Sequence, residues 1–365
     1  MLLDLHQRQI FHRLFAGTPV NRLELSRQLG LTPNKAGYAV TRMISMGLLR
    51  ECSPNGKGRG RPAVPVEIDT TRRQILGVAL YGGGLGLAHL NLRGQPLRAV
   101  QSIAVSEPAK LIRSAEKAIG KNLTADHFAI GVSATGFMEP REKRLLLSSA
   151  LAGRRESDLT PLFDAAGKTP VCLQNDMYAM AARWLLTQAD ELTQDVLLVL
   201  LNDGQVGATV LVAGKPISGC ILGGNELGHM RMPVATDRCY CGHTGCLERI
   251  FSSEYARARL GMVGALPQMI EQYDGKRGGM FELIGLIATG VANATNFLRP
   301  HRLVLVSPFT RYPLFANELL LQIRERLLDA LAARVRVDLW EQPASTPAET
   351  AAYLPLAAMC LEGWR

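Results

Sequence analysis

A short segment in the second half of the chain carries the side chains of a metal site. His229 is followed after nine residues by Cys239, and Cys241 and Cys246 lie within the next seven positions. One imidazole and three thiolates complete the tetrahedral coordination of Zn²⁺ and leave no open position for a substrate. The pattern predicts one structural zinc ion per chain, which would stabilise a loop with few apolar residues to bury. His243 is an alternative ligand, and unrelated surface cysteines are the alternative to a metal site.

Positive charge is concentrated at the N-terminal end of the chain. Residues 1–74 contain 12 Lys and Arg against five Asp and Glu, whereas the remaining residues contain 29 against 27. A small basic segment beside a near-neutral body is typical of a nucleic-acid-binding domain, although a solvated basic face would give the same count. We therefore expect residues 1–74 to bind DNA.

The pattern of residues 1–45 predicts three helices, of which the last two are joined by a short turn. Thr32 suits the N-cap of the third helix, and Pro33 fits its first position. Its buried face would consist of Ala36, Val40, Met43 and Ile44. Such a pair is the helix-turn-helix arrangement, whose second helix reads the major groove. The outward side chains expected to contact DNA are Asn34, Lys35, Tyr38, Thr41 and Arg42.

Two apolar-rich stretches, 48–52 and 63–69, follow on either side of a basic, glycine-rich tip. As strands they would form the wing of a winged helix-turn-helix domain. Lys57, Arg59 and Arg61 are separated by glycines and can lie in a narrow minor groove, where the negative potential favours arginine. A flexible linker would explain the glycines but not the position directly after a helix-turn-helix.

From residue 75 onward, expected strands and helices alternate, which indicates an α/β body. Glycine-rich hairpins near 75–97 and 196–217 suggest a duplicated lobe, and long helices are expected near 252–272 and 280–297. We divide the body into a first lobe and a second lobe that carries the zinc loop and the dimerisation helices. The expected boundaries are 1–74 for the DNA-binding domain, 75–186 completed by a C-terminal helix at 348–365 for the first lobe, and 187–347 for the second lobe.

Two motifs resemble the ROK family of repressors, open reading frames and sugar kinases. One is Glu226-Leu227-Gly228-His229 followed by Cys239-x-Cys241-Gly242-x-x-Gly245-Cys246-x-Glu248, and the other is the Asn-Asp pair at the end of Leu173-Gln174-Asn175-Asp176. Within the family, the chain is similar to regulators of the N-acetylglucosamine and glucose type. The resemblance implies a two-lobed actin/hexokinase-like fold with sugar held between the lobes. It places the sugar-contacting residues at Asn175, Asp176, Glu226, His229 and Glu248.

The resemblance also shows what this chain lacks. The kinase branch carries an Asp-x-Gly-Gly-Thr signature in the first hairpin, and here Ala79 replaces its Asp. The second phosphate loop is Asn202-Asp203-Gly204-Gln205-Val206-Gly207, in which Asp203 would repel phosphate. Ser307-Pro308-Phe309 replaces the late nucleotide-binding glycines, although Asp176, the general base of a kinase, is kept. We therefore expect no enzymatic activity.

We therefore expect the chain to be a sugar-responsive regulator that binds DNA. The form we expect is a repressor of carbohydrate uptake or catabolism genes. Control by a partner protein instead of free sugar, and an ATP-dependent sugar kinase with a DNA-binding head, are the alternatives. Arg154 stands where relatives usually carry Trp, and Ala150 stands for an Asn, so the sugar stays open. Arg154 and Arg155 together could attract a phosphorylated sugar.

Composition sets the remaining expectations. The chain has no run of about 20 uninterrupted apolar residues and no signal-peptide pattern at its start, so we expect a cytoplasmic protein without membrane insertion. The scattered cysteines are read as ordinary packing residues. Because one winged helix contacts few base pairs, a homodimer or a dimer of dimers on a two-fold operator is expected.

Overall fold

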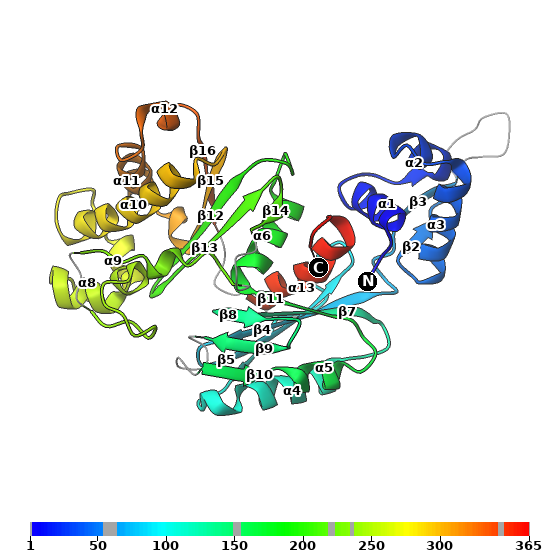
Figure 1. The fold of residues 1–365 in the computed structure, drawn as a ribbon, viewed down its shortest axis with the longest axis horizontal. Coiled ribbons are helices and arrows are strands. Elements are labelled where there is room, and N and C mark those ends of the chain that lie inside the picture. The colour runs from blue at the N-terminus through cyan, green and yellow to red at the C-terminus, as the bar shows by residue number, and fades with distance from the viewer. Residues whose placement is uncertain are drawn as a thin grey trace.

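The computed structural model describes residues 2–53, 64–148, 155–217, 223–233, 237–341 and 347–364. A small N-terminal head lies beside a body of two lobes (Figure 1). We use "head" for the described residues up to 69. Its three strands pair in the order β1-β3-β2. The head elements are α1 (Leu5–Phe15), β1 (Val20–Asn21), α2 (Arg22–Gln28), α3 (Pro33–Ser45), β2 (Leu49–Glu51) and β3 (Pro65–Ile68).

Side-chain caps fix where the head helices begin. The Asn21 side chain accepts a 2.9 Å hydrogen bond from the backbone N–H of Glu24 at the start of α2. Thr32 caps α3 in the same way, and these bonds satisfy N–H groups that have no partner inside the helix. Ile44, which is expected on the buried face of α3, is only half-buried. Ala39 is buried in that face instead. The buried residues of α3 are Ala36, Ala39, Val40 and Met43.

The first lobe is built on a five-stranded sheet of order β11-β7-β4-β5-β6. Side chains alternate along β4: Leu76 and Val78 belong to the core beneath α4 and α5, whereas Ile75 and Ala79 belong to the core beneath α6 and α13. A small sheet, β10-β9-β8, adjoins it. The elements are β4 (Gln74–Tyr81), β5 (Gly84–Asn91), β6 (Gln101–Ala104), η1 (Pro108–Lys110), α4 (Leu111–Asn122), β7 (His127–Ala134), β8 (Phe137–Glu139), β9 (Arg144–Leu147), β10 (Arg155–Asp158), α5 (Thr160–Ala166), β11 (Val171–Asn175), α6 (Asp176–Thr187) and α13 (Pro347–Cys360).

The second lobe repeats this plan in the order β14-β13-β12-β15-β16, again with two antiparallel and two parallel pairings. The duplication expected from the two hairpins is therefore present. The single long helix expected at 252–272 is wrong, because Gly261 takes a left-handed φ of 65° and ends α8. The elements are β12 (Val196–Asn202), β13 (Gln205–Val212), β14 (Lys215–Pro216), η3 (Leu227–His229), α7 (Leu247–Ile250), α8 (Ser253–Leu260), α9 (Leu266–Glu271), α10 (Gly279–Leu298), β15 (Arg302–Val306), η4 (Pro308–Arg311), α11 (Pro313–Arg324), α12 (Asp329–Ala332) and β16 (Arg336–Trp340).

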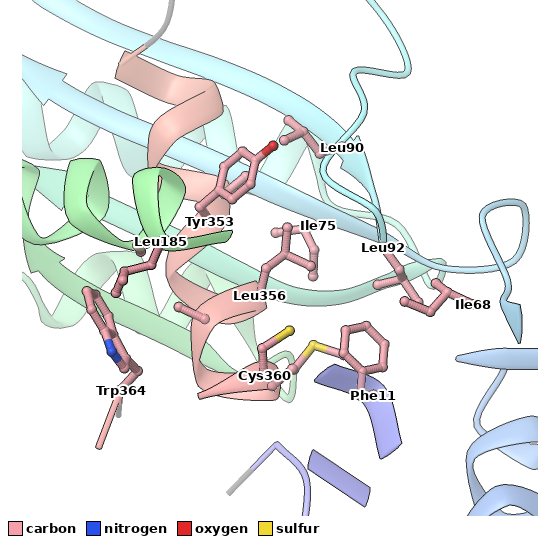
Figure 2. Close-up of a cluster of buried hydrophobic side chains, with 14 of the residues drawn as sticks. Phe11, Ile68, Ile75, Leu90, Leu92, Leu185, Tyr353, Leu356, Cys360 and Trp364 are labelled. Carbon is pink, nitrogen blue, oxygen red and sulfur yellow. The ribbon is translucent and has the colours of Figure 1, made fainter. Parts of the chain in front are cut away.

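Helix α13 returns from the end of the chain to cover the first sheet. Gly77 on β4 and Gly131 on β7 allow this approach, because a Cβ atom at either position would overlap a backbone carbonyl of α13. The C-terminal end of α13 also reaches the head: Phe11 of α1 and Cys360 of α13 belong to the same buried cluster (Figure 2). The head and the first lobe consequently share one continuous hydrophobic core.

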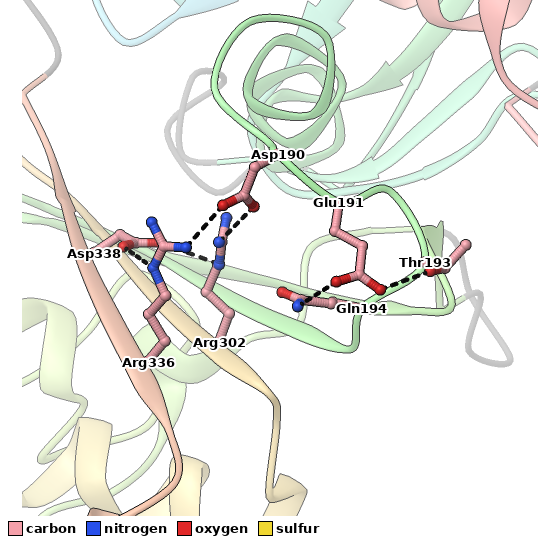
Figure 3. A network of polar contacts seen from close by, with 7 residues as sticks. All are labelled: Asp190, Glu191, Thr193, Gln194, Arg302, Arg336 and Asp338. Atoms are coloured by element: carbon pink, nitrogen blue, oxygen red, sulfur yellow. Dashed lines mark hydrogen bonds and ion pairs between the residues drawn. The ribbon is translucent and has the colours of Figure 1, made fainter.

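The segment that links the two lobes after α6 is anchored by charge. Asp190 accepts hydrogen bonds from Arg302 (2.6 Å) on β15 and Arg336 (2.8 Å) on β16 (Figure 3). Both arginines also pair with Asp338, so the buried Arg302 is neutralised. Trp184 of α6 stacks under the Arg302 guanidinium. These contacts fix the end of α6 on the second sheet.

Among the described residues, one helix, α10, is long and apolar enough to cross a membrane by length and composition alone. Its side chains Leu283, Ile284, Ile287 and Val291 are fully buried in the core of the second lobe. Such burial is what the central helix of a folded domain requires.

Candidate ligand cleft and metal site

The carboxyl end of β11 places two polar side chains at the mouth of the cleft between the lobes. Asn175 ends the strand and caps α6, since its side-chain oxygen accepts a 2.8 Å hydrogen bond from the Met177 N–H. Its amide nitrogen donates to the Gly136 carbonyl oxygen, also at 2.8 Å. Asn175 is therefore held rigidly, with part of its hydrogen-bonding capacity left. Asp176, the first residue of α6, lies beside it in the same cavity.

The second lobe supplies the opposite wall of this cavity, which has a volume of about 230 Å³. Glu226 precedes η3 and Glu248 lies in α7. The Glu248 carboxylate accepts a 3.4 Å hydrogen bond from the backbone N–H of Val206, which ties α7 to β13. Asn175, Asp176, Glu226 and Glu248, separated by up to 73 positions in the sequence, therefore line one cavity, which we call the carboxyl cleft.

The electrostatics of the carboxyl cleft keep its acids close to neutral. Burial raises the pKa of Asp176 to about 7. Burial, with repulsion from neighbouring carboxylates, also raises the pKa of Glu226 and of Glu248 to about 7. A carboxyl group that is partly protonated at neutral pH can both donate and accept hydrogen bonds. Such a set suits a ligand with several adjacent hydroxyl groups.

The four sequence-predicted metal ligands lie together at one edge of the carboxyl cleft. The donor atoms of His229, Cys239, Cys241 and Cys246 all lie within 4.8 Å of one another. The Cys241 and Cys246 sulfurs are 3.6 Å apart, and the Cys239 sulfur is 3.7 Å from Nδ1 of His229. Zn–S bonds of ~2.3 Å in a tetrahedron place sulfurs about 3.8 Å apart, so the donor set and spacing fit zinc.

The thiols are costly to ionise without a cation. Burial raises the pKa of the Cys239 thiol, and it raises that of Cys246 to about 12. A bound divalent cation would reverse this preference, because it binds the thiolate form. His243 Nδ1 lies 3.6 Å from the Cys241 sulfur, so the alternative ligand is near the cluster but outside the group of four.

His229 faces two ways. With Nδ1 toward Cys239, its Nε2 lies 3.1 Å from the Tyr240 hydroxyl and 3.6 Å from a Glu226 carboxylate oxygen. His229 is not among the described residues that line the carboxyl cleft, whereas Tyr240 and Glu226 are. Its contact with a ligand there would therefore pass through these neighbours.

Sequence reasoning missed Tyr240 and Arg249 as cleft residues. Tyr240 stands between two of the predicted metal ligands, and this position was the available signal. The Asp203 carboxylate accepts hydrogen bonds from the backbone N–H and the hydroxyl of Ser253 at the start of α8.

On the head, the polar face of α3 is open to solvent. Tyr38 is 69% exposed. The other outward residues of the expected set, Asn34, Lys35, Thr41 and Arg42, are exposed as well. The wing residues Lys57, Arg59 and Arg61 lie outside the described residues, as do Ala150 and Arg154 and the side chain of Arg155.

Two α/β lobes of identical topology, with a carboxyl cleft between them and a Cys/His cluster at its edge, define a sugar-kinase-like class of fold. Residues 94–354 match the ROK family, and the chain belongs to that family.

The similar proteins include DNA-binding regulators and sugar kinases. The chain is 25% identical over 352 residues to the DNA-binding transcriptional repressor Mlc of Escherichia coli K12, covering 88% of this chain and 85% of that protein. It is 19% identical over 363 residues to the DNA-binding transcriptional dual regulator NagC of the same strain, covering 92% and 87%. A glucokinase of Halalkalibacterium halodurans is 29% identical, but over only 37% of this chain and 43% of that one.

Solved structures with a similar fold also include both a regulator and a sugar kinase. A ROK family transcriptional regulator, described as a homologue of E. coli Mlc, superimposes with a TM-score of 0.77 at 20% identity and covers 97% of this chain and 96% of its own. A ROK family glucokinase from Streptomyces griseus, in complex with glucose and AMPPNP, gives 0.64 at 18% identity and covers 77% of this chain and 98% of its own. The regulator thus matches nearly the whole chain.

Proposed function

We propose that this protein is a sugar-responsive, DNA-binding transcriptional repressor of carbohydrate uptake or catabolism genes, acting in the cytoplasm without phosphoryl transfer. The observation that carries the proposal is the single core joining the head, with its exposed polar helix α3, to a body that holds a carboxyl cleft. The match to Mlc and NagC over most of the chain supports the same function.

For the head we propose a winged helix-turn-helix domain in residues 1–74. Helices α2 and α3 would form the helix-turn-helix pair, with α3 entering the major groove. Lys57, Arg59 and Arg61 of the wing would lie in the adjacent minor groove. The residues assigned to base and phosphate contacts on α3 are Asn34, Lys35, Tyr38, Thr41 and Arg42.

For the body we propose a first lobe of residues 75–186 completed by residues 348–365, and a second lobe of residues 187–347. A sugar in the carboxyl cleft would bond to Asn175 and Asp176 on the first lobe and to Glu226 and Glu248 on the second. His229 would act on the sugar through Glu226 and Tyr240, given its two contacts there.

We propose one structural zinc ion per chain, held by Nδ1 of His229 and by the thiolates of Cys239, Cys241 and Cys246. Bound zinc would cross-link the loop through these four ligands, which leave no coordination position open for a substrate. Glu226 is three residues before His229 and Glu248 is two residues after Cys246, so zinc ligation would restrict the positions of both carboxyl groups of the second lobe.

The cleft supports sensing better than catalysis. Asp176 could serve as a general base for a hydroxyl, but the described residues that line the phosphate side contain no lysine or arginine to hold a polyphosphate. Control by a partner protein instead of sugar is the second proposal, and an operator affinity that no sugar changes would favour it.

Sugar binding would act on DNA through α6 and α13. Asp176 begins α6, α6 packs along α13, and α13 reaches α1 of the head. Lobe closure around a sugar would therefore move the head, and in a homodimer or dimer of dimers it would change the spacing of two heads. Only a difference in sugar affinity between the two arrangements can drive this, typically about 1–3 kcal/mol or roughly 5–150-fold in DNA affinity.

The test starts from the full-length protein and a pool of genomic fragments, from which bound sequences are selected. Fluorescence anisotropy on a selected site then measures DNA affinity during titration with neutral sugars and sugar phosphates. We expect a two-fold-symmetric site and at least one sugar that changes the affinity by fivefold or more. Failure to select any site would refute the function. ADP release from ATP with the same sugars would instead favour the kinase.

A further inference from the structure

A second cavity adjoins the carboxyl cleft on the side away from the zinc loop. It has a volume of about 110 Å³ and shares Thr135, Asp176, Leu200 and Gln205 with the cleft. The two spaces therefore meet at the Asp176 side chain. We call this second space the apolar chamber.

Its walls come from both lobes, and most of the surface that they expose is apolar. Ala79 and Leu80 of β4 and Met180 of α6 line it from the first lobe, and Leu200 of β12 lines it from the second. Pro308 and Pro347 also contribute. A polar group placed against this hydrocarbon would lose its contacts with water, and only the smaller, polar part of the wall could replace them. The polar part comes from Tyr81, Ser133, Thr135, Asp176, Asn202, Gln205 and Thr350.

The charge of the apolar chamber disfavours a phosphate. Of the described residues that line it, Asp176 is the one that can carry charge, and its charge is negative. The neighbouring space around Gly82, Gly86 and Ser102 has no lysine or arginine among its described lining either. Strong phosphate recognition needs cationic donors, and the described walls offer only neutral donors such as the side-chain amides of Asn202 and Gln205.

We propose that the apolar chamber binds an apolar substituent of the effector, so that the ligand is a sugar carrying a short alkyl or aryl group at the hydroxyl that faces Asp176. The chemical class is an alkyl or aryl glycoside or ether, in place of a free sugar or a sugar phosphate. The inference rests on the proposed function, because the sugar ring must occupy the carboxyl cleft. Size agrees, since a closed cavity of about 150 Å³ holds benzene and this chamber opens into the cleft.

Isothermal titration calorimetry of the full-length protein tests this. The probes are methyl β-glycosides of glucose, galactose and N-acetylglucosamine, each paired with its phenyl β-glycoside and with the 6-O-benzyl ether of the methyl glycoside. For at least one sugar, an aromatic member of the set should bind about ten- to fiftyfold more tightly than the methyl glycoside, as burial of an apolar ring predicts.

A filled chamber provides the matched comparison. Ala79 lines the apolar chamber but not the carboxyl cleft. In Ala79→Leu the aromatic advantage should disappear while the methyl glycoside binds as before, which also reports correct folding. Met180→Leu conserves volume and should keep the advantage.

The outcomes separate the two claims. Binding of methyl glycosides with equal or weaker binding of every aromatic derivative overturns the chamber and leaves the sugar site standing. Absence of binding by all probes overturns both. These readings come from the unaltered protein and do not depend on whether Ala79→Leu folds.

Discussion

Asp176 has a buried carboxyl group, and its negative charge is unfavourable in that position. Its carboxyl accepts a hydrogen bond from the Met177 N–H at the start of α6, which favours the anion, yet burial outweighs this and raises its pKa to about 7. A side chain kept at such a cost is typical of a binding site. Its environment is a reason to place the ligand here and not elsewhere on the first lobe.

The stability of the protein should depend on Asp176 in a defined pH window. Because the folded pKa lies above the ordinary value of 3.8, the unfolded chain ionises first, and stability is lost as pH rises from about 4 to about 7. Asp176→Asn removes this loss. Urea unfolding at pH 5 and pH 8 should show the variant gaining about 1–2 kcal/mol relative to wild type between the two, after allowance for water in the cleft. An equal difference at both pH values would contradict the assigned pKa.

The same variant tests sensing. Asp176→Asn should keep the fold and the affinity for DNA while weakening the response to sugar, because an amide cannot offer the acceptor pair of a carboxylate. Anisotropy titrations of wild type and variant on one operator measure both quantities. A variant that responds at the wild-type sugar concentration would show that the cleft is not the sensor, and control by a partner protein would be favoured.

At the scale of elements, the two proposed recognition functions depend on the loop from Glu226 to Glu248 and on helix α3. The loop has few apolar side chains to fix it, and metal ligation would replace packing. Helix α3 needs no ligand to form, since Thr32 caps it and its apolar face is buried. The loop should therefore be sensitive to chelation, while α3 should not be.

Cys241→Ser should lower the zinc content of purified protein from one ion per chain to well below it, because three ligands hold zinc far less tightly than four. Elemental analysis measures the ratio, and Cys52→Ser, which changes a cysteine of the head, is the matched control. His243→Ala should retain zinc. Loss of zinc in that variant, with retention in His229→Ala, would exchange the roles of the two histidines.

Substitutions on α3 should affect DNA in distinguishable ways. Lys35→Ala should weaken binding and reduce the slope of log affinity against log salt by about 1 if it contacts phosphate. Tyr38→Ala should relax base preference by about 1–3 kcal/mol at one position of each half-site if it contacts a base. Selection from random DNA at several salt concentrations measures both. Lys117→Ala, an exposed lysine of α4, is the control and should change neither.

At the scale of the whole molecule, head and body form one packed unit. Phe11 is fully buried and lies against the end of α13, in the same core cluster as Leu356 and Cys360 (Figure 2). A head that shares a core with the body cannot move independently of it. This continuity gives a physical route for coupling, and it also means that a body without its head would expose apolar surface.

Phe11→Ala should therefore destabilise the body as well as the head. Truncating a buried phenylalanine costs about 3–5 kcal/mol, and the loss should appear in the fluorescence of the three tryptophans, all of which lie in the body. Thermal unfolding followed by tryptophan fluorescence and by helical circular dichroism should shift together. Leu23→Ala, at a half-exposed position of α2, should shift neither by much. A body transition unchanged in Phe11→Ala would show that the two parts unfold separately.

Local features of the sequence were sufficient for several of these elements. The zinc ligands fall in one short segment, the caps at Asn21 and Thr32 act within three residues, and the two hairpins carry their own glycine turns. Each of these depends on neighbours in the chain, so residue type and spacing predict them. The family motif added the fold and the pairing of Asn175 and Asp176 with Glu226 and Glu248, which no spacing would reveal.

Tertiary packing decided the rest. That Asp203 bonds to Ser253, that Tyr240 lines the cleft, and that Leu80, Met180 and Pro308 line the apolar chamber depend on how two lobes and their helices stack. Phe11 and Cys360 join one core from opposite ends of the chain for the same reason. Contacts between distant segments are set by the shapes of whole layers and by close approaches such as that of α13 over Gly77, and a linear sequence does not specify these locally.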